Sequence, residues 1–181
     1  MNLKQRASKN LFILSLLLFI NFGPLNAQTL PTAQGFIEDL FDIYLTIPDG
    51  QQIESFEKLM LEAEQYKELN PELAEAWIAC ALIHTLYAGD QINPLKAAKE
   101  FKVARDQFSQ SIELDASAMK GYATAFLGRL YTMMPGWPVS YGSDRKSKQL
   151  LQQALDTDAN TMSNNAYYGE YLLGNKLYQE A

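Results

Sequence analysis

Two residue types that often serve as nucleophile, base or metal ligand occur only once each in this sequence. They are Cys80 and His84, the only cysteine and the only histidine in 181 residues. Their spacing places both on one face of a helix. A catalytic site needs a nucleophile with a base beside it, and a zinc site needs several such ligands. We therefore expect no catalytic residue, no metal and no cofactor, and we expect both side chains to be buried in the core, with a catalytic His84 as the alternative.

Aromatic side chains in a loop form the second candidate. The segment 135–142 reads PGWPVSYG and contains Trp137 and Tyr141. Aromatic residues in a loop can form a binding platform. We expect instead that Pro135 and Pro138 stiffen the crossing while Trp137 fills the gap between the flanking helices. The binding platform remains the alternative.

The elements that must position these side chains are helices, because apolar residues recur every three to four positions and no useful strand-like alternation occurs. The pattern predicts an all-α fold with about seven helices, over residues 36–45, 53–69, 71–88, 93–114, 118–134, 143–158 and 164–173. Asn-Pro pairs at 70–71 and 93–94 are typical helix starts, since asparagine caps free amides and proline is tolerated next to it. Gly128 lies inside a helix, where glycine is weakening, so we expect it to pack closely on a neighbouring helix.

The first 27 residues have the pattern of a secretory signal peptide. A basic segment, an apolar run over residues 11–20 and a helix-breaking exit that ends at Ala27 follow one another. An uncleaved anchor is the alternative, but a run of about ten residues is shorter than the roughly 20 needed to span a bilayer core. No cysteine directly follows the run, so an N-terminal lipid is excluded. We expect a periplasmic or secreted protein that begins at Gln28 and has no stable membrane insertion.

Composition is consistent with one soluble domain over residues 28–181, which is long enough to bury a core. The net charge of the chain is −6, and loss of the three cations of the signal segment, Lys4, Arg6 and Lys9, makes it −9. Such a surface repels nucleic acid and anionic lipid, so neither is an expected partner. A single cysteine cannot form an internal disulfide, so stability must come from packing.

Several segments resemble the tetratricopeptide repeat family, whose units are antiparallel helix pairs of about 34 residues. The residues that resemble second helices of a unit are Ala104, Phe108 and Ser111 before Ile-Glu-Leu-Asp at 112–115, and Ala154-Leu155 before Asp158-Ala159. Those that resemble first helices are Leu127-Gly128 with Tyr131, and Tyr168-Gly169 with Leu172. The resemblance covers residues 71–181 and implies a right-handed array of helix hairpins, with residues 28–70 as a divergent N-terminal pair. Ala116 and Ala159 depart from the pattern, since the family usually has proline there.

The insertion PGWPVSYG between two such helices is similar to the T component of tripartite ATP-independent periplasmic transporters. This resemblance implies a transport accessory protein that self-associates around an apolar channel and binds a periplasmic substrate-binding protein. The sequence stops at Ala181, where the second helix of the last unit would begin. Either a truncated copy or a partner that completes this edge is therefore expected.

In the resembled repeat, the first helix of each pair lines a concave surface, and the corresponding residues define a candidate groove. They are Ile78, Leu82, Leu86, Arg129, Thr132, Met133 and Glu170. The apolar members would bury the body of a ligand, and Arg129 with Glu170 would orient it. If residues 36–69 fold back over this surface, it is core instead.

Together these patterns favour an exported, non-catalytic protein that binds an apolar small molecule or a partner protein. A structural scaffold of the cell envelope is the alternative. A hydrolase is the least favoured reading, because no catalytic arrangement can be assembled from the sequence.

Overall fold

The computed structural model of this protein describes residues 31–176, which contain seven α-helices and no β-strand. The helices are α2 (Ala33–Thr46), α3 (Ile53–Leu69), α4 (Ala74–Gly89), α5 (Pro94–Asp115), α6 (Tyr122–Met133), α7 (Asp144–Thr157) and α8 (Met162–Gly174). The predicted all-α class with about seven helices is therefore confirmed. None of the helices in this range is both long and apolar enough to cross a membrane. The predicted signal peptide, residues 1–27, lies outside the described residues.

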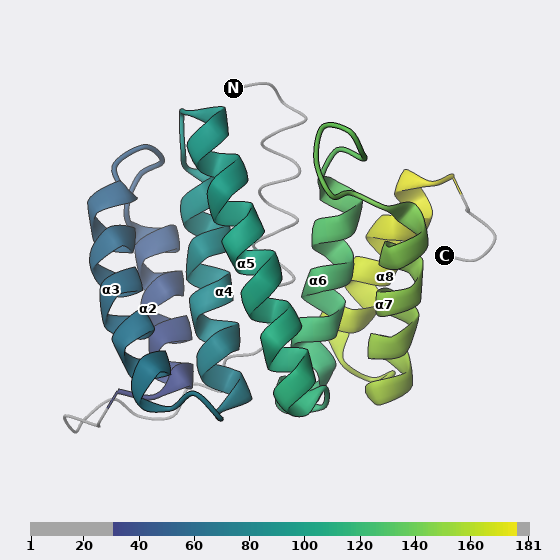
Figure 1. Ribbon diagram of the computed structural model, residues 1–181, viewed down its shortest axis with the longest axis horizontal. Coiled ribbons are helices and arrows are strands. Elements are labelled where there is room, and N and C mark those ends of the chain that lie inside the picture. The colour runs from purple at the N-terminus through teal and green to yellow at the C-terminus, as the bar shows by residue number, and fades with distance from the viewer. Residues whose placement is uncertain (1–30, 177–181) are drawn as a thin grey trace. The chain divides into compact units, whose positions relative to one another are not determined.

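The described residues divide into two compact units. We call residues 31–119, with α2 to α5, the N-terminal unit, and residues 120–176, with α6 to α8, the C-terminal unit (Figure 1). A short 3₁₀ helix, η2 (Ala118–Gly121), spans the boundary, and Met119, Lys120 and Gly121 have φ angles of 47°, 62° and 77°. Consecutive residues in the left-handed region cannot continue a right-handed helix. For this reason α6 starts at Tyr122, whereas the sequence pattern predicted a start at residue 118.

In the N-terminal unit, α4 is the central helix and contacts α2, α3 and α5. Its neighbours contribute large side chains to the core: Leu40 from α2, Phe56 from α3 and Phe108 from α5, all fully buried. Almost every residue of α4 is buried as well, including many alanines. A helix that is apolar on all sides is the expected centre of a helical unit.

In the C-terminal unit, α6 and α7 form a hairpin and α8 packs on both. Gly128 of α6 lies at the point of closest approach, since a Cβ atom there would be 2.8 Å from Cγ of Leu151 and 3.2 Å from Cβ of Leu150. The expected close packing at Gly128 is thus confirmed. Leu151 and Ala154 of α7 are fully buried on this face.

Two of the predicted helix starts have the expected capping hydrogen bonds. Asn93 Oδ1 accepts from the amide of Leu95 at 2.9 Å, directly before α5. Ser143 Oγ accepts from the amide of Lys146 at 3.3 Å, at the start of α7. Both side chains compensate amides that have no partner within the helix.

The third predicted start, Asn70-Pro71, is wrong. Helix α4 begins at Ala74, and Asn70 instead ends α3, where its side-chain amide donates to the carbonyl of Tyr66 at 2.8 Å. The side chain that would have capped α4 is therefore used by the preceding helix.

Candidate functional site

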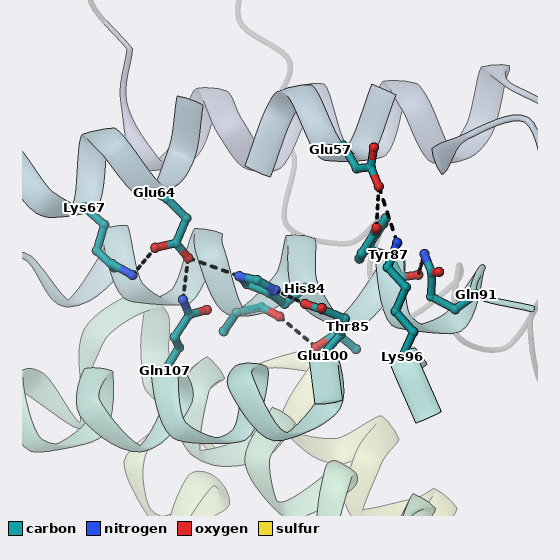
Figure 2. Close-up of polar contacts among 11 residues, drawn as sticks. Glu57, Glu64, Lys67, His84, Thr85, Tyr87, Gln91, Lys96, Glu100 and Gln107 are labelled. Carbon is teal, nitrogen blue, oxygen red and sulfur yellow. Dashed lines mark hydrogen bonds and ion pairs between the residues drawn. The ribbon is translucent and has the colours of Figure 1, made fainter. Parts of the chain in front are cut away.

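A polar network crosses the otherwise apolar interior of the N-terminal unit, and His84 of α4 is at its centre (Figure 2). His84 is only 7% exposed. Its Nδ1 lies 2.7 Å from Glu100 Oε2 on α5, and its Nε2 lies 3.1 Å from Glu64 Oε1 on α3. The imidazole ring is therefore held between carboxyl groups on the two neighbouring helices.

Glu64 is the acceptor that joins most of this network. Besides His84, the ammonium of Lys67 contacts its Oε2, and the amide of Gln107 donates to its Oε1 at 2.6 Å. Burial removes water from this carboxylate and would raise its pKa, but the donors outweigh that effect and lower the pKa to about 2. Glu64 stays ionised in all but strongly acidic solution.

The thiol of Cys80 is buried one helical turn before His84. Burial, followed by the nearby charge of Glu64, raises the pKa of this thiol to about 12. Because the thiolate is the reactive form, Cys80 is inert as a nucleophile. The expected burial of both Cys80 and His84 is confirmed.

A second polar contact ties the same three helices together near one end of α4 (Figure 2). The hydroxyl of Tyr87 donates to Glu57 Oε1 on α3 at 2.5 Å, and this hydrogen bond lowers the pKa of Glu57. The ammonium of Lys96 on α5 lies 3.5 Å from the same carboxylate and 4.9 Å from the centre of the Tyr87 ring. The two networks hold α3, α4 and α5 in register.

The His84 network links three helices through contacts within the protein. A general acid or base must reach the reacting group through a hydrogen bond, whereas both ring nitrogens of His84 already contact protein carboxylates. No group of three or more histidine, cysteine or carboxylate side chains within 31–176 is arranged to hold a metal ion.

Three of the four apolar residues of the predicted groove lie on α4. Ile78, Leu82 and Leu86 are all buried. They belong to the N-terminal unit, whereas the other four predicted groove residues belong to the C-terminal unit. In this structure, these three side chains present no exposed apolar surface.

The two charged residues of the predicted groove bind each other. Arg129 Nε donates to Glu170 Oε2 at 2.7 Å and Nη2 donates to Oε1 at 3.2 Å, which links α6 to α8. The guanidinium is buried and lies 4.9 Å from the centre of the Tyr167 ring. A two-pronged pair of this kind is among the stronger hydrogen-bonded contacts in proteins. The pair therefore holds the C-terminal unit together.

The remaining two groove residues lie near the end of α6. The hydroxyl of Thr132 is 2.5 Å from that of Ser147, so Thr132 faces α7. Met133 is exposed at the last position of the helix. It therefore lies directly before the loop that joins α6 to α7.

The loop 135–142 does not use Trp137 as a plug, which corrects the expectation from the sequence. Trp137 is 89% exposed. The base of the loop is closed by other contacts: the amide of Gly142 donates to the carbonyl of Pro135 at 2.9 Å, and the ring of Tyr141 packs edge-on against Tyr131 at 5.6 Å. These contacts close the base of the loop without the indole of Trp137.

The backbone of this loop is closely packed. A Cβ atom on Gly142 would lie 1.8 Å from the carbonyl oxygen of Met134, so no larger residue fits there without a backbone shift. The amides of Val139 and Ser140 both donate to the carbonyl of Gly136, at 3.1 and 3.2 Å. The loop is thus a defined turn and not an extended connection.

The tip of the loop presents two apolar side chains to solvent and projects beyond the ends of α6 and α7 (Figure 1). Val139 is 79% exposed, beside the exposed Trp137. The sequence patterns did not single out Val139. An available signal was its place between Pro138 and Gly142, where no helical periodicity requires an apolar residue to be buried.

Comparisons of the chain with protein-family models, curated proteins and solved structures find no match. The resemblance to tetratricopeptide repeats and to transporter T components therefore stays a hypothesis from the sequence. Between the two regions described above, the loop 135–142 is the candidate functional site, because its apolar side chains are accessible whereas the His84 network is enclosed.

Proposed function

We propose that this chain is an exported, non-catalytic helical protein that binds a partner protein through the loop 135–142. The observation that carries the proposal is the exposure of Trp137 on a loop whose backbone is fixed by hydrogen bonds. Tryptophan is enriched among the residues that contribute most to protein interfaces. A loop that is already ordered also loses little conformational freedom on binding.

A protein partner fits this geometry better than a small molecule. Small-molecule sites are concave and enclose most of the ligand. Trp137 and Val139 instead project from the end of a helix hairpin, so the partner must supply the surrounding pocket. The burial of Ile78, Leu82 and Leu86 also favours a protein partner, since these side chains were the expected wall of a small-molecule groove.

The proposal includes the role that the sequence resemblance implies, an accessory protein of periplasmic transport with a tetratricopeptide-like array. Its support is the α6–α7 hairpin with Gly128 at the helix contact, together with the PGWPVSYG insertion between those helices. Export rests on the pattern of the first 27 residues.

The alternative is a structural scaffold of the cell envelope. A second exposed apolar pair, Ile92 and Leu95 at the start of α5, favours it. A scaffold contacts more than one partner. Because this pair belongs to the N-terminal unit and the loop 135–142 to the C-terminal unit, the two could bind different partners.

The test compares the full chain with its Trp137→Ala variant in pull-downs from an envelope extract of the source cells. We expect the variant to lose specific partners while its circular dichroism and melting temperature stay unchanged. The matched control is the double variant Ile92→Ala with Leu95→Ala, which also truncates exposed apolar residues and should keep those partners. Partners that persist with Trp137→Ala but disappear with the control would support the scaffold, and partners that persist with both would reject the loop as the binding element.

A further inference from the structure

Charge is distributed unevenly between the two units. Residues 31–119 contain six lysines and arginines against sixteen aspartates and glutamates, a net charge of −10. Residues 120–176 contain six against four, a net charge of +2. Three of these six cations, Arg145, Lys146 and Lys148, lie in the first turns of α7, and all three are exposed. With the exposed Asp144 in the same first turn, residues 144–148 keep a net charge of +2, so an acidic chain has a basic surface directly after the loop 135–142.

Contacts connect this basic surface to the base of the loop. The ammonium of Lys146 lies 5.1 Å from the centre of the Tyr131 ring, and Tyr131 packs against Tyr141 within the loop. The amide of Ser143 also donates to the carbonyl of Tyr131 at 3.0 Å. The N-terminal end of α7 adds partial positive charge of the same sign. The base of the loop that carries the apolar tip is therefore in contact with the basic first turn of α7.

We infer that the loop 135–142 and the first turns of α7 form a docking surface for an acidic surface of a partner protein. This inference rests on the proposed function and specifies the chemistry of the partner. Trp137 and Val139 would enter an apolar pocket, and Arg145, Lys146 and Lys148 would face carboxylates around that pocket. Apolar anchors supply most of the affinity in such interfaces, whereas complementary charges at the rim select the partner and speed association.

An anionic membrane is the first competing occupant, because membrane interfaces favour tryptophan and anionic lipids attract lysine. The chain as a whole has a net charge of −6, however, and an extended anionic surface repels it. A partner protein presents a bounded acidic patch that engages only the cations of α7. The charge distribution therefore favours the protein.

A second copy of this chain is the other competing occupant, since its N-terminal unit is acidic. That contact would join unlike surfaces of two identical chains. Such head-to-tail contacts continue into open filaments unless the geometry closes a ring. A different acidic protein can bind this surface as a single pair, without forming a filament or a ring, so it is the favoured occupant.

The experiment places the photo-cross-linker p-benzoylphenylalanine at position 149 of the full chain, expressed in the source cells, where the exposed Gln149 lies beside the cations of α7, so that Trp137 and Val139 stay in place. After irradiation, mass spectrometry identifies the adduct and the peptide of the partner that carries it. We expect a protein adduct whose linked surface has an excess of aspartate and glutamate. Charge reversal by Arg145→Glu with Lys146→Glu should lower the yield of this adduct by roughly tenfold or more, because repulsion replaces attraction at the rim.

The matched control is Lys99→Glu with Lys102→Glu, which makes the same charge change at exposed positions of α5 and should leave the yield unchanged. The neutral pair Arg145→Gln with Lys146→Gln replaces the reversal if the latter loses its helical circular dichroism. With the purified partner, the difference between parent and reversal variant should shrink from 0.05 M to about 0.5 M salt, since screening weakens exposed charge pairs.

The possible failures separate the two proposals. If Trp137→Ala removes the adduct while both charge pairs leave it intact, the acidic partner is rejected and the loop remains the binding element. If Trp137→Ala leaves the yield unchanged, or if no adduct forms, the proposed function fails as well. Adducts only between two copies of the chain, or flotation with phosphatidylglycerol vesicles without a protein adduct, would assign the surface to self-association or to lipid and overturn the inference.

Discussion

The two units of this protein use polar and apolar side chains in opposite ways. In the N-terminal unit, the side chains of His84 and Cys80 are buried between α3, α4 and α5, and the half-buried Glu64 contacts His84. In the C-terminal unit, a large apolar side chain, Trp137, is held in solvent by an ordered loop. A residue type that is capable of chemistry therefore does not locate function by itself. Accessibility and the partners that a side chain already has decide its role.

The difference also separates stability from binding. A buried ion pair contributes little net stability compared with apolar packing, but removal of one partner leaves an uncompensated buried charge and is costly. An exposed apolar side chain can be removed at almost no cost to the fold. This contrast between the two units would be wrong if substitutions in the His84 network left stability unchanged, or if substitutions at the tip of the loop 135–142 unfolded the protein.

The largest effect is expected for Glu64→Ala. The substitution leaves the donors of His84, Lys67 and Gln107 without their shared acceptor, and we expect a loss of about 3 kcal/mol in the free energy of unfolding. The melting temperature should fall by about 6 to 12 °C. Thermal unfolding followed by circular dichroism measures it, with Glu68→Ala, an exposed glutamate on the same helix, as the control. Equal melting temperatures for the two variants would show that the network does not stabilise the unit.

The next effect concerns the packing of the C-terminal unit. Gly128→Ala places a methyl group 2.8 Å from Cγ of Leu151 and should cost about 1 to 3 kcal/mol through overpacking. The control is Gly169→Ala in α8, where nothing lies within 4 Å of the added atom. That substitution should raise stability by about 0.5 to 1 kcal/mol, because alanine favours a helix more than glycine does. Urea unfolding measures the change in the free energy of unfolding for both variants. Changes of the same sign would contradict the close contact between α6 and α7 at Gly128.

Acid should weaken the N-terminal unit by a smaller amount. The pKa of Glu64 is about 2 in the folded chain, below its ordinary 4.5, so its contribution is complete above pH 4.5 and is lost as the pH falls towards 2. With allowance for the partial exposure of the carboxylate, we expect a loss of roughly 1 kcal/mol between pH 6 and pH 3. Asp39 acts in the opposite direction, because burial and then Asp42, Glu38 and Glu62 raise its pKa.

Urea unfolding of the parent and of Glu64→Gln at both pH values isolates the contribution of Glu64. The variant cannot lose a charge at position 64, so the loss of stability between pH 6 and pH 3 should be smaller than in the parent. An equal loss in the two chains would mean that other carboxylates cause the acid sensitivity.

The smallest effect on stability is expected for Trp137→Ala. Because the side chain is 89% exposed, the free energy of unfolding should change by less than about 0.5 kcal/mol. A buried plug would instead cost about 3 to 5 kcal/mol on truncation. Chemical denaturation distinguishes these values easily, and a large loss would return Trp137 to the core.

Sequence periodicity predicted the helices well where local signals and packing agree. The limits of α3 match the prediction, and the capping side chains Asn93 and Ser143 make the expected hydrogen bonds. Gly128 was also informative, since a glycine within a helix is explained by a close neighbour. The Asn70-Pro71 signal failed because one asparagine can serve only one helix end, and here it serves α3.

The candidate sites were harder to predict, because they depend on contacts between distant residues. Glu64 and Glu100 lie 20 and 16 positions from His84, on two other helices, and each has an ordinary place in its own helical pattern. The position of Trp137 depended on whether the base of the loop left a gap. The ring of Tyr141 packs against Tyr131 at the base of the loop, and no local pattern records such a contact.

The two tryptophans of the chain, one in each unit, also make the molecule its own optical probe. The indole of Trp77 donates to the carbonyl of Pro71 at 2.8 Å and has the ammonium of Lys67 4.8 Å from its ring, whereas Trp137 is surrounded by water. Iodide in solution should therefore quench the fluorescence of Trp137 first, and docking of a partner should shift its emission to shorter wavelength. A Trp137→Phe chain would report the unfolding of residues 31–119 alone, so that the two units can be followed separately in one polypeptide.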